Sequence, residues 1–245
     1  HPACIKVLNG DLVLTEPLAL TAVVTGTNVT CNGAGNGIIS ITSPSGGYGT
    51  YEYSVDGGVT WQFSGQFTGL IPGPYNVRIR DAANIACYAI LRAPLIITEP
   101  PALSASVANT NVSCFNAGDG TITISGAAGG YGHYQYTING GAEWFDSGNF
   151  THLIPGFYNV QMRDADNPVC IRILNGSLRI TEPGILSASI LKTDISCNGR
   201  DDGRIIISLP SGGSGNYTYS IDGGLHWQPS GDFPGLRPLT YNVQI

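Results

Sequence analysis

Apolar and polar residues alternate along short runs of this chain, and Gly, Pro and Asn separate the runs. In residues 121–125, Thr-Ile-Thr-Ile-Ser, every second side chain is apolar, as in a β-strand with one buried face and one wet face. No stretch of the sequence has the apolar spacing of an amphipathic helix. The pattern therefore predicts an all-β protein of short strands.

The middle of the chain shows how these strands are expected to follow one another. The strands predicted there cover residues 103–114, 120–126, 134–138, 157–164 and 170–181. The dipeptide Asn139-Gly140 marks a turn between them, and Asn175-Gly176 marks a bulge or a small hairpin in the last one. About seven short strands with frequent turns are typical of an immunoglobulin-like β-sandwich.

One unit of 83 residues recurs along the chain. A Gly-Gly-x-Gly block followed by Tyr-x-Tyr begins at Gly46, Gly129 and Gly212, and a tryptophan follows each block. The repeats predict four segments: 1–17, the C-terminal strand of a preceding repeat; 18–100 and 101–183, two complete domains; and 184–245, a truncated third domain. Since the first and last segments are incomplete, we expect the sequence to be a window of a longer array.

The links between repeats are very short. Each repeat ends on Thr-Glu-Pro, and the next one begins at once. No flexible Gly-Ser linker separates them, so we expect the immunoglobulin-like domains to be arranged end to end as a rod.

Charge and composition exclude several classes of partner. The formal net charge is −6 and no basic cluster occurs, which argues against a nucleic-acid partner. No apolar run approaches the ~18 residues of a membrane span, so no membrane insertion is expected in this window. His133, His152 and His226 occupy different positions of the repeat, so they form no repeated catalytic or metal site. We expect neither enzyme activity nor a cofactor.

The six cysteines form two series with the same 83-residue period. Their presence in a Lys-poor β protein indicates disulfides and an extracellular setting, whereas zinc would favour close Cys-x-x-Cys pairs, which are absent. In the predicted topology, the two cysteines of one repeat lie at opposite poles, more than ~20 Å apart. We therefore favour an interdomain disulfide, Cys31–Cys170. The alternative is one bond within each repeat, Cys31–Cys87 and Cys114–Cys170.

Aromatic residues recur at fixed positions of the unit. We predict that they form the core of each sandwich, because burying a tryptophan contributes up to ~5 kcal/mol. The predicted core aromatics are Tyr53, Trp61, Tyr136, Trp144, Tyr219 and Trp227. The alternative is an exposed strip for stacking on sugars, since Tyr51 and Tyr53 point to one face of a strand.

Acidic residues raise the question of calcium between domains. Calcium requires six to eight oxygen ligands, and no dense acidic cluster recurs in every repeat. Asp56 and Asp222 correspond to Asn139 in the second repeat. The shared property of these three residues is turn formation, so we do not favour a calcium site.

The order of motifs resembles that of the SprB-type repeat of large bacterial surface adhesins. The matching elements are Val-Thr-Cys-Asn-Gly (29–33), Gly-x-Ile-x-Ile (37–41), the Gly-Gly-x-Gly-x-Tyr-x-Tyr block, and Ile-Thr-Glu-Pro. Cys114-Phe115-Asn116 and Leu239 depart from the pattern, but only in loops. The resemblance implies immunoglobulin-like domains, type IX secretion and a cell-surface or extracellular location.

Our main hypothesis from the sequence is a structural or adhesive segment of a tandem-repeat surface adhesin or filament. Its expected partners are neighbouring repeats, identical chains in a filament, and surface glycans. The alternatives are a carbohydrate-binding module that uses surface tyrosines and a passive spacer of a secreted enzyme.

Overall fold

The computed structural model describes residues 6, 8 and 10–245. Cys4, a member of one cysteine series, lies outside the described residues. Strands and loops account for the described part of the chain, in which no helix occurs. Residues 10–17, expected as a C-terminal strand, pair with no other strand in the described structure.

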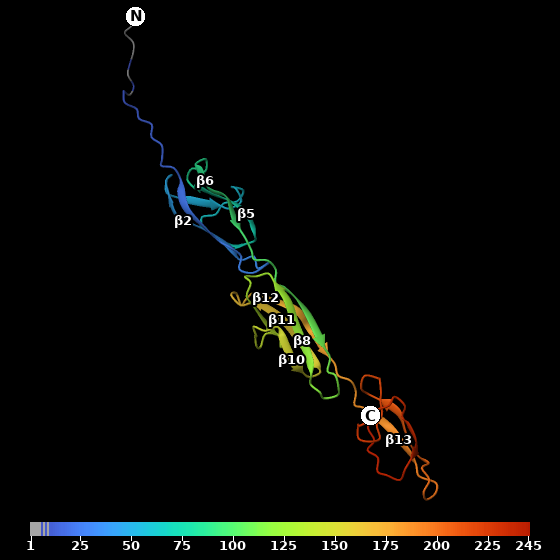
Figure 1. Ribbon diagram of the computed structural model, residues 1–245. Helices are drawn as coiled ribbons and strands as arrows, with labels where there is room; N and C mark the ends of the chain where they lie inside the picture. Colours follow the sequence, from blue (N-terminus) through green and yellow to red (C-terminus); the bar gives the residue numbers. More distant parts are fainter. Residues whose placement is uncertain (1–5, 7, 9) are drawn as a thin grey trace. The chain divides into compact units, whose positions relative to one another are not determined.

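The first complete repeat forms two three-stranded antiparallel sheets (Figure 1). One sheet has the order β1-β2-β4 and the other β3-β5-β6. Their bounds are β1 Thr21–Thr27, β2 Gly37–Ser45, β3 Tyr51–Ser54, β4 Gln66–Leu70, β5 Gly73–Asp81 and β6 Tyr88–Ile97. The two sheets enclose one apolar core, as in an immunoglobulin-like sandwich.

The core of this sandwich follows from alternation along its strands. In β2 and β5 every second side chain is buried, and Ile39 and Ile79 are fully enclosed. β6 contributes Leu95 and Ile97, which are buried, whereas Ile96 between them faces solvent. Apolar residues two apart thus supply one buried face per strand.

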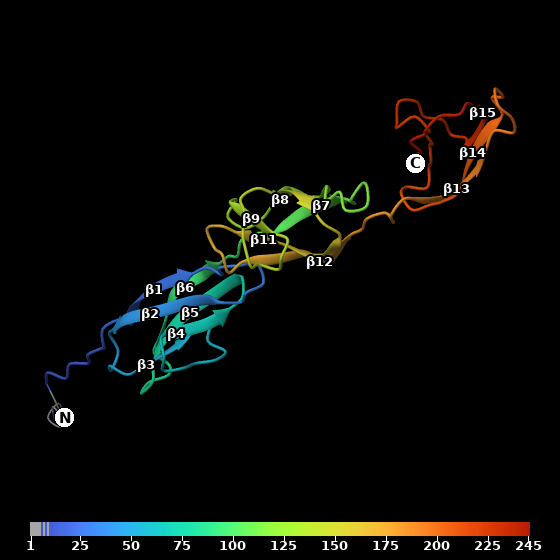
Figure 2. The same cartoon turned by 90° about the horizontal axis from the view of Figure 1, so that it is seen from below.

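The second repeat has the same strands in the same order (Figure 2). They are β7 Ser104–Thr110, β8 Gly120–Ala128, β9 Tyr134–Thr137, β10 Asn149–Leu153, β11 Gly156–Asp164 and β12 Ile171–Ile180. β7, β8 and β10 form one sheet, and β9, β11 and β12 form the other. Each complete repeat has six strands where about seven were expected, and β10 lies in a region where no strand was predicted.

The given sequence ends within the third repeat, of which the structure describes one three-stranded sheet. Its strands are β13 Ser187–Thr193, β14 Gly203–Ser211 and β15 Asp232–Leu236. Residues 239–245 occupy the sequence position of β5 but make only isolated bridges, such as Asp222 with Asn242. The positions that match β6 and β12 lie beyond Ile245, the last residue of the given sequence.

The structure divides the chain into two compact units. The first contains His1–Leu103 together with Gly129–Gly132 and Asp166–Cys170, and the second contains the rest. Two short segments of the second repeat therefore belong with the first unit. The disulfide described below holds one of these segments.

The aromatic residues predicted for the core divide into two groups. Tyr53, Tyr136 and Tyr219 are buried at corresponding positions. The three tryptophans are not core residues, which corrects the prediction for them: Trp61 and Trp144 are half-buried, and Trp227 is 48% exposed. The reason is that each indole lies over a turn at the side of the sandwich, as described next.

Candidate functional site

A disulfide joins the loop after β1 to the second repeat. Cys31 bonds to Cys170, with 5.4 Å between their Cα atoms and 139 residues between them in sequence. Both cysteines belong to the first compact unit. Neither intra-repeat pair, Cys31–Cys87 or Cys114–Cys170, is formed, and the described thiols of Cys87, Cys114 and Cys197 are free.

Two hydrogen bonds between Thr30 and the side chain of Asn36 close the loop that carries Cys31. Asn36 Oδ1 accepts a hydrogen bond from the Thr30 backbone N–H at 3.0 Å, and Asn36 Nδ2 donates to Thr30 Oγ1 at 2.7 Å. Asp119 holds Ser113 in the same way in the second repeat. Hydrogen bonds from Ser113 lower the pKa of Asp119, so the acceptor in the second repeat is a carboxylate and carries a negative charge.

The Thr-Glu-Pro segment is part of this loop structure and not only a linker. Glu99 Oε2 accepts a hydrogen bond from the Gly33 backbone N–H at 2.7 Å, and Glu99 Oε1 accepts one from Asn32 Nδ2 at 3.1 Å. In the second repeat, Glu182 accepts a bond from the Asn116 N–H. The end of each complete repeat therefore fixes the loop that presents its first cysteine.

The Gly-Gly-Tyr-Gly block of the second repeat also reaches the Cys31 loop. Tyr131 Oη donates a hydrogen bond of 3.1 Å to the carbonyl oxygen of Thr30, the residue before Cys31. The disulfide and this hydrogen bond thus join two separate segments of the second repeat to one loop of the first. Because all of these atoms lie in the first compact unit, they form a single local structure.

The first glycine of the block is required by close packing. Gly46 has a φ of +86°, and a Cβ atom there would collide with the carbonyl oxygen of Ala19. Gly129 meets Ala102 and Gly212 meets Ile185 in the same way. The block therefore packs directly against the backbone of the residues that begin each repeat.

Asp56 organises the turn that follows β3. Its carboxylate accepts hydrogen bonds from Ser54 Oγ, Thr60 Oγ1 and the backbone N–H groups of Val59 and Thr60. Burial opposes its ionisation, but these hydrogen bonds prevail and lower its pKa to about 2. Asn139 makes the equivalent bond with Thr137, so the position requires a hydrogen-bond acceptor and not a negative charge.

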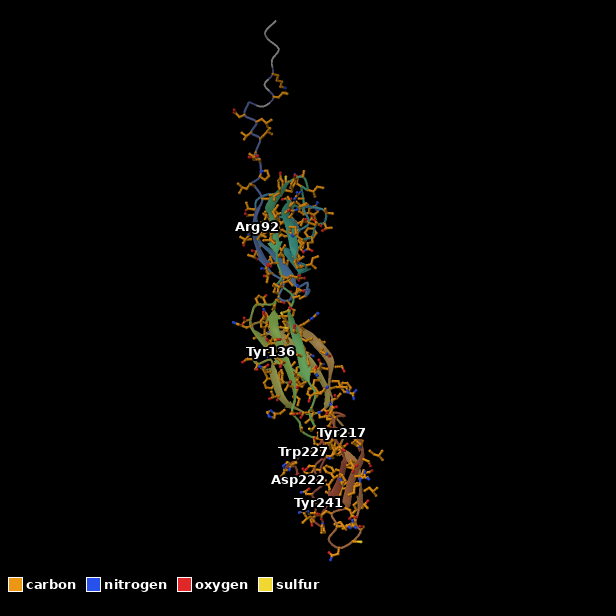
Figure 3. The ribbon with its side chains drawn as sticks, turned by 45° about the vertical axis from the view of Figure 1, so that its right-hand side comes forward. Arg92, Tyr136, Tyr217, Asp222, Trp227 and Tyr241 are labelled. Atoms are coloured by element: carbon orange, nitrogen blue, oxygen red, sulfur yellow. A yellow bond between two sulfur atoms is a disulfide. The ribbon has the colours of Figure 1, made fainter. Side chains whose placement is uncertain are left out.

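Each tryptophan covers this turn. Trp61 Nε1 donates to the carbonyl oxygen of Gly58 at 2.9 Å, and the Arg80 guanidinium lies 4.4 Å from the indole centroid. Arg163 stacks on Trp144 in the second repeat at 4.5 Å. Trp227, labelled in Figure 3, keeps its bond to the Gly224 carbonyl oxygen, and the position that matches Arg80 falls one residue after Ile245, the last residue given.

The tyrosine positions offer no exposed strip for sugar stacking. Tyr53 is buried, and Tyr51 is half-buried, with its hydroxyl donating to the carbonyl oxygen of Gly46. The described residues contain no cluster of three or more potential metal ligands. Within the same residues, no helix is long and apolar enough to cross a membrane.

Two contacts of the Cys31 loop were not predicted from the sequence. Glu99 has the counterparts Glu16 and Glu182, and Tyr131 has the counterpart Tyr48, but the partners of Glu99 and Tyr131 lie 66 and 101 residues away. Only the folded structure shows that both act on the Cys31 loop.

The comparisons with known proteins identify the repeated unit. The SprB repeat profile matches residues 23–60, 106–143 and 191–225. No curated protein matches the chain. Among solved structures, the chain is similar to the three N-terminal domains of the highly immunogenic outer capsid protein (Hoc) of bacteriophage RB49, with 14% identity, a TM-score of 0.39, and coverage of 93% of this chain and 80% of that one.

Proposed function

We propose that this chain, which belongs to the SprB repeat family of structural repeats, forms a stiff segment of a bacterial surface adhesin or extracellular filament. In this proposal the immunoglobulin-like domains follow one another end to end. In this proposal, function depends on the bonds that link consecutive domains and not on a catalytic pocket.

The Cys31–Cys170 disulfide is the observation that carries the proposal. Contacts between adjacent small domains are usually weak enough to allow hinge motion. A disulfide typically contributes about 2–4 kcal/mol by restricting the unfolded chain, and it also prevents two bonded loops from separating in the folded state. Together with the bond from Tyr131 to Thr30, it limits hinge motion between the first and second repeats.

The same bond supports an extracellular location. Structural disulfides persist in oxidising compartments and are rare where thiols are kept reduced. An adhesive role, gliding motility and type IX secretion follow from family membership alone, and we include them in the proposal on that basis. The Tyr-x-Tyr positions lend no support to a glycan-binding function, because Tyr53 is buried and the hydroxyl of Tyr51 donates to the carbonyl oxygen of Gly46.

Small-angle X-ray scattering of the whole chain tests the proposed stiffness. We expect an extended particle whose scattering fits one narrow set of conformations. The double variant Cys31→Ser/Cys170→Ser should give a broader distribution of end-to-end distances, whereas Cys114→Ser, which alters a free thiol, should not. Equal flexibility of the double variant and the unchanged chain would refute the proposal.

A further inference from the structure

Every arginine of the two complete repeats lies on one of the two sheets of its sandwich. Residues 18–183 contain six arginines and no lysine, and all six arginines lie on β5, β6, β11 or β12. The opposite sheets, formed by β1, β2 and β4 and by β7, β8 and β10, contain no Asp, Glu, Lys or Arg. Each sandwich therefore has one uncharged sheet and one sheet that carries all of its arginines.

In the first repeat, two rows of side chains cross the outer face of the arginine-bearing sheet. Glu52 pairs with Arg80 across β3 and β5, and Arg80 pairs with Tyr88 across β5 and β6. Arg78 and Ile90 pair in the next row. The residues of β5 between these positions are buried in the core, so the five side chains share the outer face. We call these five residues the arginine face of the first repeat.

The two arginines of this face differ in how their charge is balanced. Arg80 Nε donates to Glu52 Oε2 at 2.7 Å and forms an ion pair. Arg78 forms no ion pair with any carboxylate of the described residues. The arginine face of the first repeat therefore carries one unbalanced positive charge, on Arg78.

Aromatic and aliphatic side chains surround this unbalanced guanidinium. It lies 5.6 Å from the centroid of the Tyr88 ring. A Cβ atom added to Gly58 would be 3.5 Å from Arg78 Nη1 and 3.2 Å from Trp61 Cζ2, so the indole borders the same space. Tyr88 is 58% exposed, and Ile90, opposite Arg78, is 59% exposed. The first repeat thus presents a cation beside open apolar surface.

In the second repeat, two sequence differences offset each other. Gln135 occupies the position of Glu52, and Gln161 occupies the position of Arg78. The face therefore loses one carboxylate and one guanidinium together. Arg163 donates two hydrogen bonds to the neutral Oε1 of Gln135 and has no ion pair in the described structure. These positions thus keep one net positive charge in both repeats, although different residues supply it.

The apolar part of the face is kept as well. Ile171 pairs with Arg163 and Ile173 pairs with Gln161, and more than half of each isoleucine side chain is exposed. The Arg163 guanidinium lies 4.5 Å from the centroid of the Trp144 indole. Exposed isoleucines and an unbalanced cation contribute little to a buried core. Their presence at matching positions of two repeats therefore indicates a surface for binding.

We propose that the arginine face of each complete repeat binds a polysaccharide whose sugars carry carboxylate or sulfate groups. A guanidinium forms charge-assisted hydrogen bonds with either anion, and the C–H groups of a sugar ring can pack on the exposed ring of Tyr88 or on the exposed isoleucines. A folded protein partner typically buries about 800 Å² on each side, which is more than a few side chains supply, whereas a linear polymer makes few contacts per repeat. The inference gives the proposed surface segment a ligand and does not depend on its stiffness.

Biolayer interferometry of the full 245-residue chain on immobilised polymers tests this binding. We expect the chain to bind polygalacturonate, which carries carboxylates, or dextran sulfate, and not to bind neutral dextran. The two charged polymers distinguish a carboxylate ligand from a sulfate ligand. Equal binding to neutral dextran, or no binding to either charged polymer, would overturn the inference. Equally tight binding to poly-L-glutamate would also overturn it, because the face would then select an acidic chain and not a sugar.

Three variants test whether the arginine face is the site. Arg78→Gln/Arg163→Gln should weaken binding about tenfold, since it removes the unbalanced guanidinium from each repeat. The matched control, Lys192→Gln/Arg200→Gln, removes the same charge from exposed positions of the third repeat and should leave binding unchanged. Glu52→Gln should tighten binding about threefold, because it frees the charge of Arg80. Gln135 already accepts hydrogen bonds from Arg163 in this role, so the Glu52→Gln variant keeps the fold.

The gain in Glu52→Gln separates a binding role from a structural one, since loss of an ion pair would not strengthen an unrelated contact. Equal weakening by the control variant, or no gain in Glu52→Gln, would contradict the inference. Failure of binding leaves the stiffness proposal intact, because the scattering experiment contains no polysaccharide.

Discussion

The carboxylate of Glu99 accepts a 2.7 Å hydrogen bond from the backbone N–H of Gly33, two residues after the disulfide-bonded Cys31. Glu99, at the end of the first repeat, thus holds the loop whose cysteine forms the disulfide with the second repeat. Glu99→Ala should destabilise this loop by about 1–2 kcal/mol, since it removes the acceptor of two hydrogen bonds. Hydrogen exchange measured by mass spectrometry should show faster exchange at residues 30–34.

The control for this prediction is Glu16→Ala. Glu16 is the sequence counterpart of Glu99, but residues 10–17 pair with no strand of the described structure. Exchange at residues 30–34 should not change in this variant. An unchanged exchange rate in Glu99→Ala would show that the carboxylate does not support the loop.

Acid should weaken the turn after β3 in the first repeat through Asp56. Its pKa is about 2 in the folded protein, against an ordinary aspartate value of 3.8, because the hydrogen bonds from Thr60 and Ser54 outweigh the opposing effect of burial. A lowered pKa stabilises the fold above about pH 4, and this contribution is lost as pH falls through about 2. Asp56→Asn should remove this part of the acid dependence, as measured by hydrogen exchange at residues 54–62 between pH 2 and 4. The same acid dependence in the variant would exclude Asp56 as its source.

The tryptophans should differ in their contributions to stability. Trp61→Ala removes a cation–π contact with Arg80 and a hydrogen bond to Gly58, and we expect a loss of about 2 kcal/mol for the first repeat. Trp227→Ala removes only the hydrogen bond, so its cost should be about 1 kcal/mol. Chemical denaturation monitored by hydrogen exchange of each repeat distinguishes the two. A larger cost at Trp227 would contradict the assigned contacts.

Two glycines of one block offer a matched pair of variants. Gly46→Ala places a Cβ against the Ala19 carbonyl oxygen and should destabilise the first repeat by about 3 kcal/mol or more. Gly49→Ala also has a positive φ, but nothing lies within 4 Å of the added atom, so its cost should be only about 1 kcal/mol. Thermal unfolding followed by hydrogen exchange would measure both. Similar costs would show that close packing at Gly46 is unimportant.

The sequence predicted the all-β fold and most strand positions, because alternation of apolar residues and Gly or Asn turns act locally. It did not predict β10, where Phe150 is flanked by residues with no clear alternation. Burial of Trp61 was overestimated from its large apolar surface. Its actual position depends on Arg80, a residue of β5 that stacks on it.

The sequence predicted only part of the structure around the Cys31–Cys170 disulfide. The period of the cysteines and an argument about opposite poles favoured Cys31 with Cys170. The supporting roles of Glu99 and Tyr131 depend on contacts between residues far apart in sequence, which no local pattern encodes.

The central claim is that a disulfide links consecutive repeats. Peptide mapping by mass spectrometry under non-reducing conditions, on chain purified from an oxidising compartment with free thiols blocked, tests it most directly. The account predicts a crosslinked pair of peptides containing Cys31 and Cys170. Recovery of Cys31 with Cys87, or of Cys114 with Cys170, would place the bonds within repeats and contradict the account.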